Sequence, residues 1–137
     1  MSQENVDLVR SIYAAWERGD YRSAEWAHPE IQFVAGDGPA LGTWTGPAGL
    51  ADGVRGFLDA WEEYRIEAAE YRELDGERIL VLHNISGRGK ASGLQLESKT
   101  ANLFHIREGK VTRLVAYFDP ERALADLSLV PETGPRK

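Results

Sequence analysis

The sequence predicts an α+β protein in which helices pack against one face of a curved antiparallel β-sheet. Apolar residues recur at helical spacing in the first half of the chain, and runs typical of β-strands fill most of the second half. Between residues 99 and 118, a Gly-containing turn joins two strongly apolar runs, which is the pattern of a β-hairpin. Helices followed by a meander of strands are typical of the α+β class.

Length and composition fit one globular domain. The chain has 137 residues, and 42% of them are hydrophobic, which is enough for a core without disulfide or metal staples. It contains no cysteine, so disulfides and Cys-based zinc sites are excluded. We expect the domain to span residues 1–127, with a flexible tail at 128–137.

Charge and hydropathy argue against two classes of partner, nucleic acids and membranes. The net charge is −6 and the basic residues are scattered, which argues against a nucleic-acid partner. No apolar run approaches the roughly 20 residues of a membrane span, and the acidic N-terminus is unlike a signal peptide. We therefore expect a cytoplasmic protein that needs no membrane and no cofactor.

Four helices are predicted. The first runs from Ser2 to about Arg18, and its buried stripe includes Tyr13 and Trp16. A second, over about 21–27, ends at His28-Pro29 because proline disfavours helical geometry in the residue before it. The third opens at Pro47 and extends past Trp61, and the last covers about 120–127.

The strands are expected at about 31–34, 65–73, 78–88, 95–106 and 111–118. Residues 36–49 are rich in Gly and Pro and are expected to form a surface excursion. In the last hairpin, Glu108 disfavours the positive φ of a two-residue loop. We therefore predict a three-residue loop at 107–109 with a bulge at Gly109, which pairs Phe104 with Thr112 and Asn102 with Leu114.

This register sorts the hairpin into two faces, because strand side chains alternate. One face carries Thr100, Asn102, Phe104, Ile106, Thr112, Leu114, Ala116 and Phe118. The other carries Ala101, Leu103, His105, Val111, Arg113, Val115 and Tyr117. No predicted helix remains to cover the second face, so we expect a two-fold homodimer interface at Leu103, His105, Arg113, Val115 and Tyr117.

The order of several short motifs resembles the SnoaL-like branch of the nuclear transport factor 2-like superfamily, over about residues 3–127. These motifs are Trp16-Glu-Arg-Gly-Asp20, His28-Pro-Glu-Ile31, Trp44-Thr-Gly-Pro47, the 87–93 turn, Arg107-Glu-Gly-Lys-Val111 and the run 117–124. The resemblance implies a cone: a curved sheet wrapped around three to four N-terminal and C-terminal helices, with a blind pocket at its wide end. It also implies a dimer through the outer sheet face, but no particular reaction, because this fold hosts many.

The proton-transfer groups known in this superfamily are missing here. Matching to ketosteroid isomerases places Ile12, Asn102 and Ala35 where those enzymes have Tyr, Asp and Asp. Matching to SnoaL-type polyketide cyclases places Ala116 at their acid/base Asp. No Asp-Arg-Asp set like that of limonene epoxide hydrolases lies on the inward face. General acid/base catalysis needs such a group.

The expected pocket is aromatic, with one amide. Its predicted lining residues are Tyr13, Trp16, Phe33, Trp44, Phe57, Trp61, Asn102, Phe104, Leu114 and Phe118. Each aromatic residue alone is a core residue by default, but the set can hold an apolar, ring-bearing ligand. A buried amide at Asn102 must be hydrogen-bonded, either to a neighbour or to a ligand.

Two classes of function follow. The first is a pocket protein that binds a small apolar or aromatic molecule without transforming it. The alternative is an enzyme of the cyclase, isomerase or hydrolase type that uses Asp119, His83 or Tyr13. Asp119 is also the predicted N-cap of the last helix, and only one of His83 and Asn84 can face inward. The three histidines are too dispersed for a metal site.

Overall fold

The computed structural model describes residues 2–21, 25–35, 42–59 and 61–127. This part of the chain contains three helices and six strands. The helices are α1 (Ser2–Glu17), α2 (Gly46–Leu58) and α3 (Pro120–Asp126). The strands are β1 (Ala27–Ala35), β2 (Gly42–Thr45), β3 (Trp61–Asp75), β4 (Arg78–Gly89), β5 (Gln95–Arg107) and β6 (Lys110–Tyr117). The predicted tail at 128–137 lies outside the described residues.

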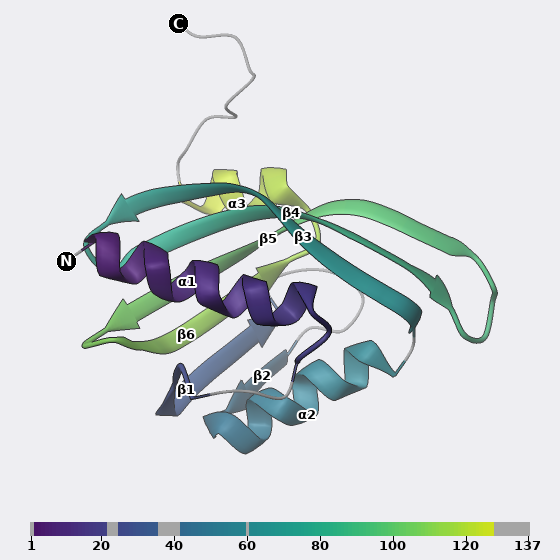
Figure 1. Cartoon of the computed structure of the whole chain (residues 1–137), viewed down its shortest axis with the longest axis horizontal. Helices are drawn as coiled ribbons and strands as arrows, with labels where there is room; N and C mark the ends of the chain where they lie inside the picture. The colour runs from purple at the N-terminus through teal and green to yellow at the C-terminus, as the bar shows by residue number, and fades with distance from the viewer. Residues whose placement is uncertain (1, 22–24, 36–41, 60, 128–137) are drawn as a thin grey trace, which may run out of the picture.

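The strands form one curved sheet in the order β2-β1-β6-β5-β4-β3 (Figure 1). From β3 to β6 each strand pairs antiparallel with the next, as the meander of short turns predicts. β1 departs from that pattern because it runs parallel to β6, while β2 lies antiparallel beside it. The α+β class is confirmed, with a mixed rather than purely antiparallel sheet.

Helices cover both faces of the sheet. α1 and α2 lie on one side, here called the inner face, and α3 lies on the other, the outer face (Figure 1). The inner core joins residues of α1 and α2, such as Ile12 and Leu50, to Ile79, Phe104 and Leu114 of the sheet. The outer core joins α3 to a separate apolar patch that includes Leu80 and Leu103. No helix of the described residues is long and apolar enough to cross a membrane.

The last hairpin has a tighter turn than predicted. Glu108 and Gly109 both have positive φ, 54° and 78°, and form a two-residue loop between Arg107 and Lys110. A bulge follows at Thr112, whose hydroxyl donates to the carbonyl of His105. Loops of this kind match the twist of the strands, which favours them despite the strain at Glu108.

The register of this hairpin differs from the predicted one by two residues. Phe104 lies opposite Leu114, and Asn102 lies opposite Ala116. A shift of two leaves side chains on the same faces. The exception is Val111, which precedes the bulge and therefore joins Ile106 in the inner core instead of facing outward.

The helix predicted at 21–27 is wrong. Residues 25–26 form a turn and Ala27 begins β1, so the helix predicted at 21–27 is not present among its described residues. The carbonyl of Trp26 accepts the backbone N–H of Val111, which ties this segment to the sheet. Pro29 lies in β1 at a register shift, where its missing N–H costs no ladder hydrogen bond.

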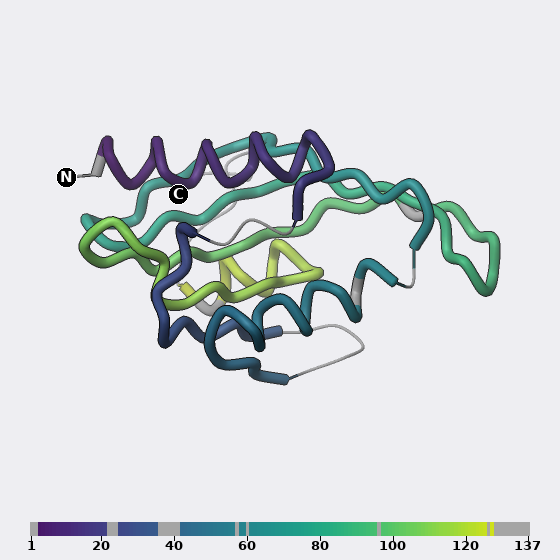
Figure 2. The backbone as a smooth tube through the Cα atoms, turned by 60° about the horizontal axis from the view of Figure 1, so that its bottom comes forward, coloured from purple at the N-terminus to yellow at the C-terminus, as the bar shows by residue number. Residues whose placement is uncertain are grey.

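The third helix also ends earlier than predicted. α2 stops at Leu58, and Trp61 begins β3 opposite Gly89. The hairpin between β4 and β5 projects beyond the helices and supplies that partner (Figure 2). Within the predicted surface excursion at 36–49, residues 42–45 form the short edge strand β2.

Candidate functional site

The buried polar side chains of the described residues all lie on the inner face of two neighbouring strands. They are His83 of β4 and Thr100 and Asn102 of β5, exposed by 4%, 4% and 8%. His83 pairs directly with Thr100 across the ladder, and Asn102 is two residues further along β5. Buried polar groups cost free energy unless they are hydrogen-bonded, so three in adjacent rows need an explanation.

Tyr13 of α1 connects two of these side chains. Its ring is fully buried. The hydroxyl oxygen lies 2.8 Å from Nδ1 of His83 and 3.0 Å from Nδ2 of Asn102. In the sequence, Tyr13 is 70 positions from His83 and 89 positions from Asn102. The three side chains form one hydrogen-bonded group, here called the Tyr13–His83–Asn102 network. The helical stripe of α1 aims Tyr13 at the sheet, and strand alternation aims the other two at α1.

Burial keeps both titratable members of the network uncharged. It lowers the pKa of His83 from 6.5 to about 4, because the imidazolium form would lose its hydration. It raises the pKa of Tyr13 well above 10, chiefly by the same desolvation, with the Asn102 hydrogen bond acting in the opposite direction. At neutral pH the site therefore contains a neutral imidazole, a phenol and an amide.

Aromatic rings surround the network. The Tyr13 ring packs edge-on against Trp16 at 4.9 Å and against Phe104 and Tyr71 at 6.0 Å between ring centroids. The guanidinium of Arg10 lies 4.7 Å from the centroid of the Tyr71 ring. Rings arranged edge-on stabilise one another beyond the area they bury, so this wall holds the Tyr13 hydroxyl in place.

Parts of the buried polar side chains remain accessible. Within the described residues, no side-chain nitrogen or oxygen atom is fully buried without a hydrogen-bond partner. His83 uses Nδ1 and Asn102 uses Nδ2 in the network, and the structure gives no partner to Nε2 of His83, Oδ1 of Asn102 or Oγ1 of Thr100. Each of these three atoms therefore keeps a small accessible surface, although the side chains are almost fully buried.

The predicted pocket residues divide into groups. Tyr13, Asn102, Phe104 and Leu114 lie together in the inner core, with Trp16 beside them. His83, and not Asn84, faces inward and joins them. The residue of α1 that meets Asn102 is Tyr13, one position on from the Ile12 that the matching to ketosteroid isomerases indicated.

Other predicted pocket residues lie elsewhere. Phe33 and Trp44 stack on each other at 5.4 Å, in close contact with Gly53 of α2. Trp61 begins β3, beside Gly87 and Gly89 of β4. Phe118 follows β6 and is 39% exposed. The side chain of Phe57 lies outside the described residues.

Asp119 does not join the network. Its carboxylate accepts the backbone N–H of Glu121 at 3.0 Å and caps the N-terminus of α3, with Pro120 in the first turn. α3 packs on the outer face, whereas Tyr13 belongs to the inner one. The N-cap role that the sequence predicts for Asp119 accounts for its position.

The argument for the predicted dimer interface fails at three of its five residues. Leu103, Val115 and Tyr117 are buried against Ala123 and Leu124 of α3. The sequence argument assumed that no helix covers this face, but only Phe118 and Asp119 separate β6 from α3, so the helix folds straight back onto the sheet. His105 is half-buried and Arg113 is exposed.

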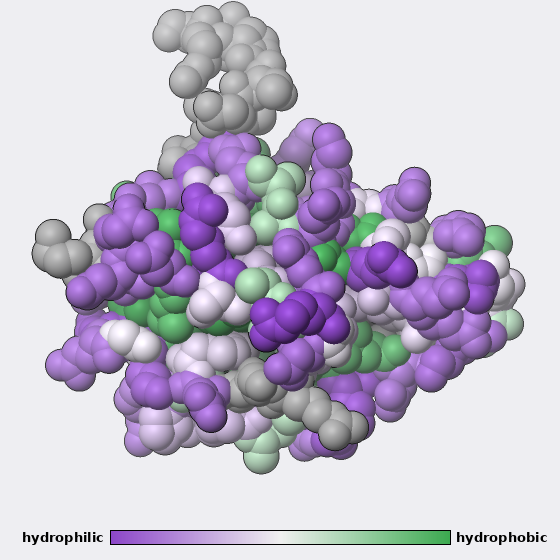
Figure 3. Space-filling view, in the orientation of Figure 1, coloured by the Kyte–Doolittle hydropathy of each residue, from purple (hydrophilic) through white to green (hydrophobic). Residues whose placement is uncertain are grey.

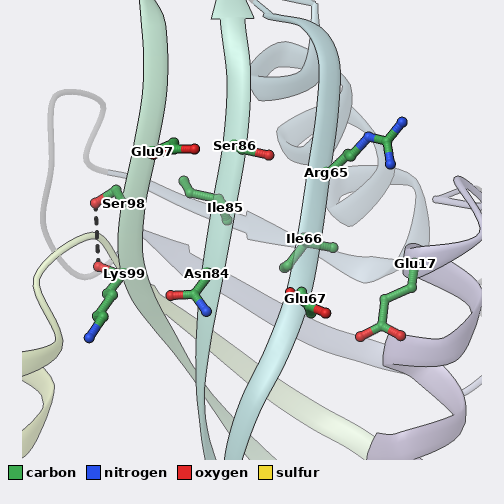
Figure 4. A pocket seen from close by; sticks show the side chains of 10 residues that line it. All are labelled: Glu17, Arg65, Ile66, Glu67, Asn84, Ile85, Ser86, Glu97, Ser98 and Lys99. Carbon is green, nitrogen blue, oxygen red and sulfur yellow. Dashed lines mark hydrogen bonds between the residues drawn. The ribbon is translucent and has the colours of Figure 1, made fainter.

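A hollow of about 690 Å³ lies over β3, β4 and β5, beyond α3 (Figure 4). Most of its polar lining residues alternate with Ile66 and Ile85 of the inner core, so they belong to the outer face. They are Arg65, Glu67, Asn84, Ser86, Glu97 and Lys99, with Glu17 of α1 at the sheet edge. Glu17 accepts the backbone N–H of Ala68 there.

No metal centre is apparent in the described part of the chain. No group of three His, Asp or Glu side chains lies close enough to share an ion, and the sequence has no cysteine. Seen from the side of α1 and α2, the surface is mostly hydrophilic, and hydrophobic side chains show chiefly in recesses between the elements (Figure 3).

A curved six-stranded sheet with two helices on its inner face has the architecture of a nuclear transport factor 2-like fold. The model of the SnoaL-like domain matches residues 9–114, and the chain belongs to that family. No curated protein matches the chain in sequence.

Solved structures share this fold at low sequence identity. A nuclear transport factor 2-like protein from Burkholderia pseudomallei is 22% identical, with a TM-score of 0.75 over 89% of this chain and 95% of its own. A protein provisionally assigned as a polyketide cyclase from Xanthomonas campestris pv. campestris is 20% identical, with a TM-score of 0.71 over 90% and 96%. TerC, co-crystallised with polyporic acid, is 22% identical, with a TM-score of 0.70 over 90% and 97%.

Sequence reasoning missed Thr100 as a site residue and did not connect Tyr13 to His83. A usable signal exists for Thr100, because Ser98, Thr100 and Asn102 alternate along one face of a strand whose next inward residue is Phe104. Polar residues at alternate positions on a core face are unusual. The hydrogen bonds to Tyr13 had no such signal, since they depend on how α1 crosses the sheet.

Proposed function

We propose that the inner face at Tyr13, His83 and Asn102 binds a small, uncharged molecule that carries an apolar ring. The observation that carries this proposal is the network itself: three polar side chains held in an aromatic wall, with free polar atoms that still reach solvent. Ligand sites typically combine mostly apolar walls with a few fixed polar groups.

The chemistry of the network favours binding over acid/base catalysis. None of its members is a carboxylate, and burial holds the pKa of His83 near 4. An efficient general base has a pKa close to the working pH. The site thus has hydrogen-bonding groups for a ligand and only a weak base.

An enzyme is the second candidate, and the contact between Tyr13 and His83 favours it. A phenol bonded to an imidazole is a pair that can pass a proton to a substrate. The neighbours in fold include a provisionally assigned polyketide cyclase and a protein crystallised with polyporic acid. A cyclase or isomerase reaction on an aromatic ketone would use Tyr13 and His83 in place of the missing carboxylates.

Titration with simple aryl ketones tests the proposed site. Binding is measured by thermal shift and calorimetry, since a ligand of the native state raises apparent stability. Asn102→Ala should weaken binding by about 1–3 kcal/mol, because the ligand loses a polar partner. Asn84→Ala is the matched control, since Asn84 neighbours His83 but faces the other way and should leave affinity unchanged.

Mass spectrometry of the bound compound separates the two candidates. The binder proposal expects the compound to be recovered unchanged after hours. Turnover that His83→Gln abolishes, while Asp119→Asn preserves it, would establish the enzyme instead. Turnover that depends on Asp119 would refute both assignments of the site.

We also propose that the chain forms a homodimer through the part of the outer face that α3 leaves open. Arg65 and Glu97 lie in one cross-strand row on either side of Ser86, and Glu67 and Lys99 lie in the next on either side of Asn84. A two-fold axis along β4 would bring each residue opposite the reverse charge of a second copy. Such complementarity steers association and fixes register.

Charge reversal tests this dimer. Arg65→Glu and Glu97→Arg should each weaken association about tenfold, and the double variant should regain most of the loss. Arg107→Glu, on the distant hairpin turn, serves as the control. Sedimentation equilibrium at micromolar concentration gives the answer, and a wild-type monomer or an unrescued double variant would refute the proposed interface.

A further inference from the structure

The hydrogen bonds of the Tyr13–His83–Asn102 network have a direction. The amide nitrogen of Asn102 can only donate, so the Tyr13 oxygen accepts that bond. Tyr13 has one proton, is fully buried, and has Nδ1 of His83 as the other partner of its hydroxyl within the described residues. The phenol therefore donates to Nδ1, and the chain runs from Asn102 through Tyr13 to His83.

This direction fixes the proton on the imidazole. When Nδ1 of a neutral imidazole accepts a hydrogen bond, the ring proton resides on Nε2. Nε2 is one of the atoms that have no hydrogen-bond partner and keep a small accessible surface, and so are Oδ1 of Asn102 and Oγ1 of Thr100. One end of the chain is thus a free N–H donor, and the other is a free carbonyl acceptor.

We propose that His83 donates Nε2–H to a ligand carbonyl oxygen while Asn102 accepts from a ligand hydroxyl, so that the site selects uncharged hydroxyketones on a rigid ring skeleton. The inference rests on the proposed binding function and adds the ligand class to it. Tyr13 acts as a positioning residue, since its bond to Nδ1 sets which nitrogen of His83 faces the ligand. Thr100, opposite His83, can either donate or accept.

The same arrangement rejects anions. No Lys or Arg belongs to the network, and Arg10 contacts its aromatic wall at the ring of Tyr71. A carboxylate placed against Oδ1 of Asn102 would meet another acceptor and leave its own charge without a partner. Unpaired buried charges are strongly unfavourable.

Nitrogen NMR tests the direction of the chain without any ligand. The protein has three histidines, so long-range nitrogen–proton spectra are simple, and His83→Gln identifies the signal of His83. We expect the neutral Nε2–H tautomer in the wild type at neutral pH. Tyr13→Phe keeps the ring but removes the proton donor, and should allow the Nδ1–H tautomer to appear. A wild-type Nδ1–H tautomer would overturn the proposal.

A matched set of two-ring compounds tests the ligand class. Hydroxytetralone carries both groups, tetralone only the carbonyl, tetrahydronaphthol only the hydroxyl, and tetrahydronaphthoic acid an anion. We expect hydroxytetralone to bind at least tenfold more tightly than either partial analogue, and the acid to bind weakest. His83→Phe should reduce the affinity for tetralone about tenfold and leave that for tetrahydronaphthol unchanged.

The outcomes distinguish this inference from the function on which it rests. If the four compounds bind but the acid binds best, or all bind equally, the ligand class is wrong and the binding site stands. If none binds, the proposed function fails and the ligand class fails with it. Equal loss of all four ligands in His83→Phe would show a structural role for the ring and refute the donor role.

Discussion

The two faces of the same sheet bury side chains of different chemistry. Under α3, the outer core consists of apolar residues and one tyrosine, with no buried amide or imidazole among the described residues. On the inner face, an imidazole, an amide and a threonine hydroxyl lie among aromatic rings. Successive residues of β5 make the contrast directly, since Asn102 faces inward and Leu103 outward.

This difference separates stability from function. Apolar side chains are enough to pack a helix on a sheet, and the contact of α3 with the outer face is an example in this chain. The inner face has polar groups where apolar ones would fit, and the hydrogen bonds of Tyr13 join two of them, His83 and Asn102. Each member of such a network contributes to stability only when its hydrogen-bond partners are present.

The largest expected effect comes from placing an amide on the apolar face. Leu103→Asn should lower the free energy of unfolding by about 3–5 kcal/mol, because it removes buried apolar volume and leaves a polar group without partners under α3. Urea unfolding followed by circular dichroism measures this. A loss below about 1 kcal/mol would show that α3 shields the face poorly, and the contrast between the two faces would weaken.

The second largest expected effect is a fall in the free energy of unfolding at acid pH, caused by His83 on the inner face. The pKa of His83 is about 4 in the folded protein and 6.5 in the reference state. Between these values the unfolded chain binds more protons, so this contribution to stability is fully present above pH 6.5 and is lost as pH falls toward 4. The difference of about 2.5 pKa units corresponds to about 3 kcal/mol.

Urea unfolding at several pH values checks this linkage. Tyr13, the side chain hydrogen-bonded to His83, does not titrate in that range. His83→Gln should remove the pH-dependent part, whereas His105→Gln should leave most of it. A wild-type curve that stays flat from pH 7 to 4.5 would mean that His83 is more hydrated than the structure shows.

Much of this architecture could be predicted from the sequence, because it follows from local patterns. The helical stripe around Tyr13, the four-strand meander and the N-cap at Asp119 depend on spacing within about ten residues. Apart from Val111, the faces were assigned correctly even though the hairpin register was off by two, since such a shift preserves alternation. Trp61 was misplaced because α2 and β3 are separated by very few residues and both carry apolar side chains.

The candidate site could be predicted only in part. Asn102 and Tyr13 each stood out as residues, but the bond between them depends on the crossing of α1 over β5, which no local pattern encodes. The position of α3 had the same difficulty. The same sequence pattern is expected whether α3 covers the outer face or leaves that face open for a partner. Only the packing of Ala123 and Leu124 on the sheet decides between these two positions of the helix.

A third region shows how an entirely apolar contact responds to shape. In α2, a Cβ added at Gly53 would come within 2.9 Å and 3.0 Å of the rings of Phe33 and Trp44, whereas at Gly56 it would meet nothing within 4 Å. Gly53→Ala should therefore destabilise by about 1–3 kcal/mol through overpacking. Gly56→Ala, in the same helix, should stabilise by about 0.5–1 kcal/mol through lost chain entropy.

Thermal unfolding of both glycine variants tests this pair. Opposite signs are expected, which makes Gly56→Ala an internal control for helix propensity. If both variants stabilise, the stacked rings of Phe33 and Trp44 can move aside, and α2 packs on β1 and β2 more loosely than the structure indicates.

The smallest expected effect is the mirror image of the first change. Asn102→Leu replaces the amide by an apolar group of similar size, while Tyr13 keeps His83 as its acceptor and loses only one donor. Tyr13 still donates to His83 and the new side chain adds buried apolar surface, so the free energy of unfolding should fall by only about 1 kcal/mol, the net worth of one hydrogen bond. Binding of hydroxytetralone should nevertheless fall at least tenfold, because the acceptor for its hydroxyl is gone. Unfolding and calorimetric titration of the same sample give both numbers. A loss of stability as large as that of Leu103→Asn would mean that the amide holds the inner face together, and its burial would then need no ligand to explain it.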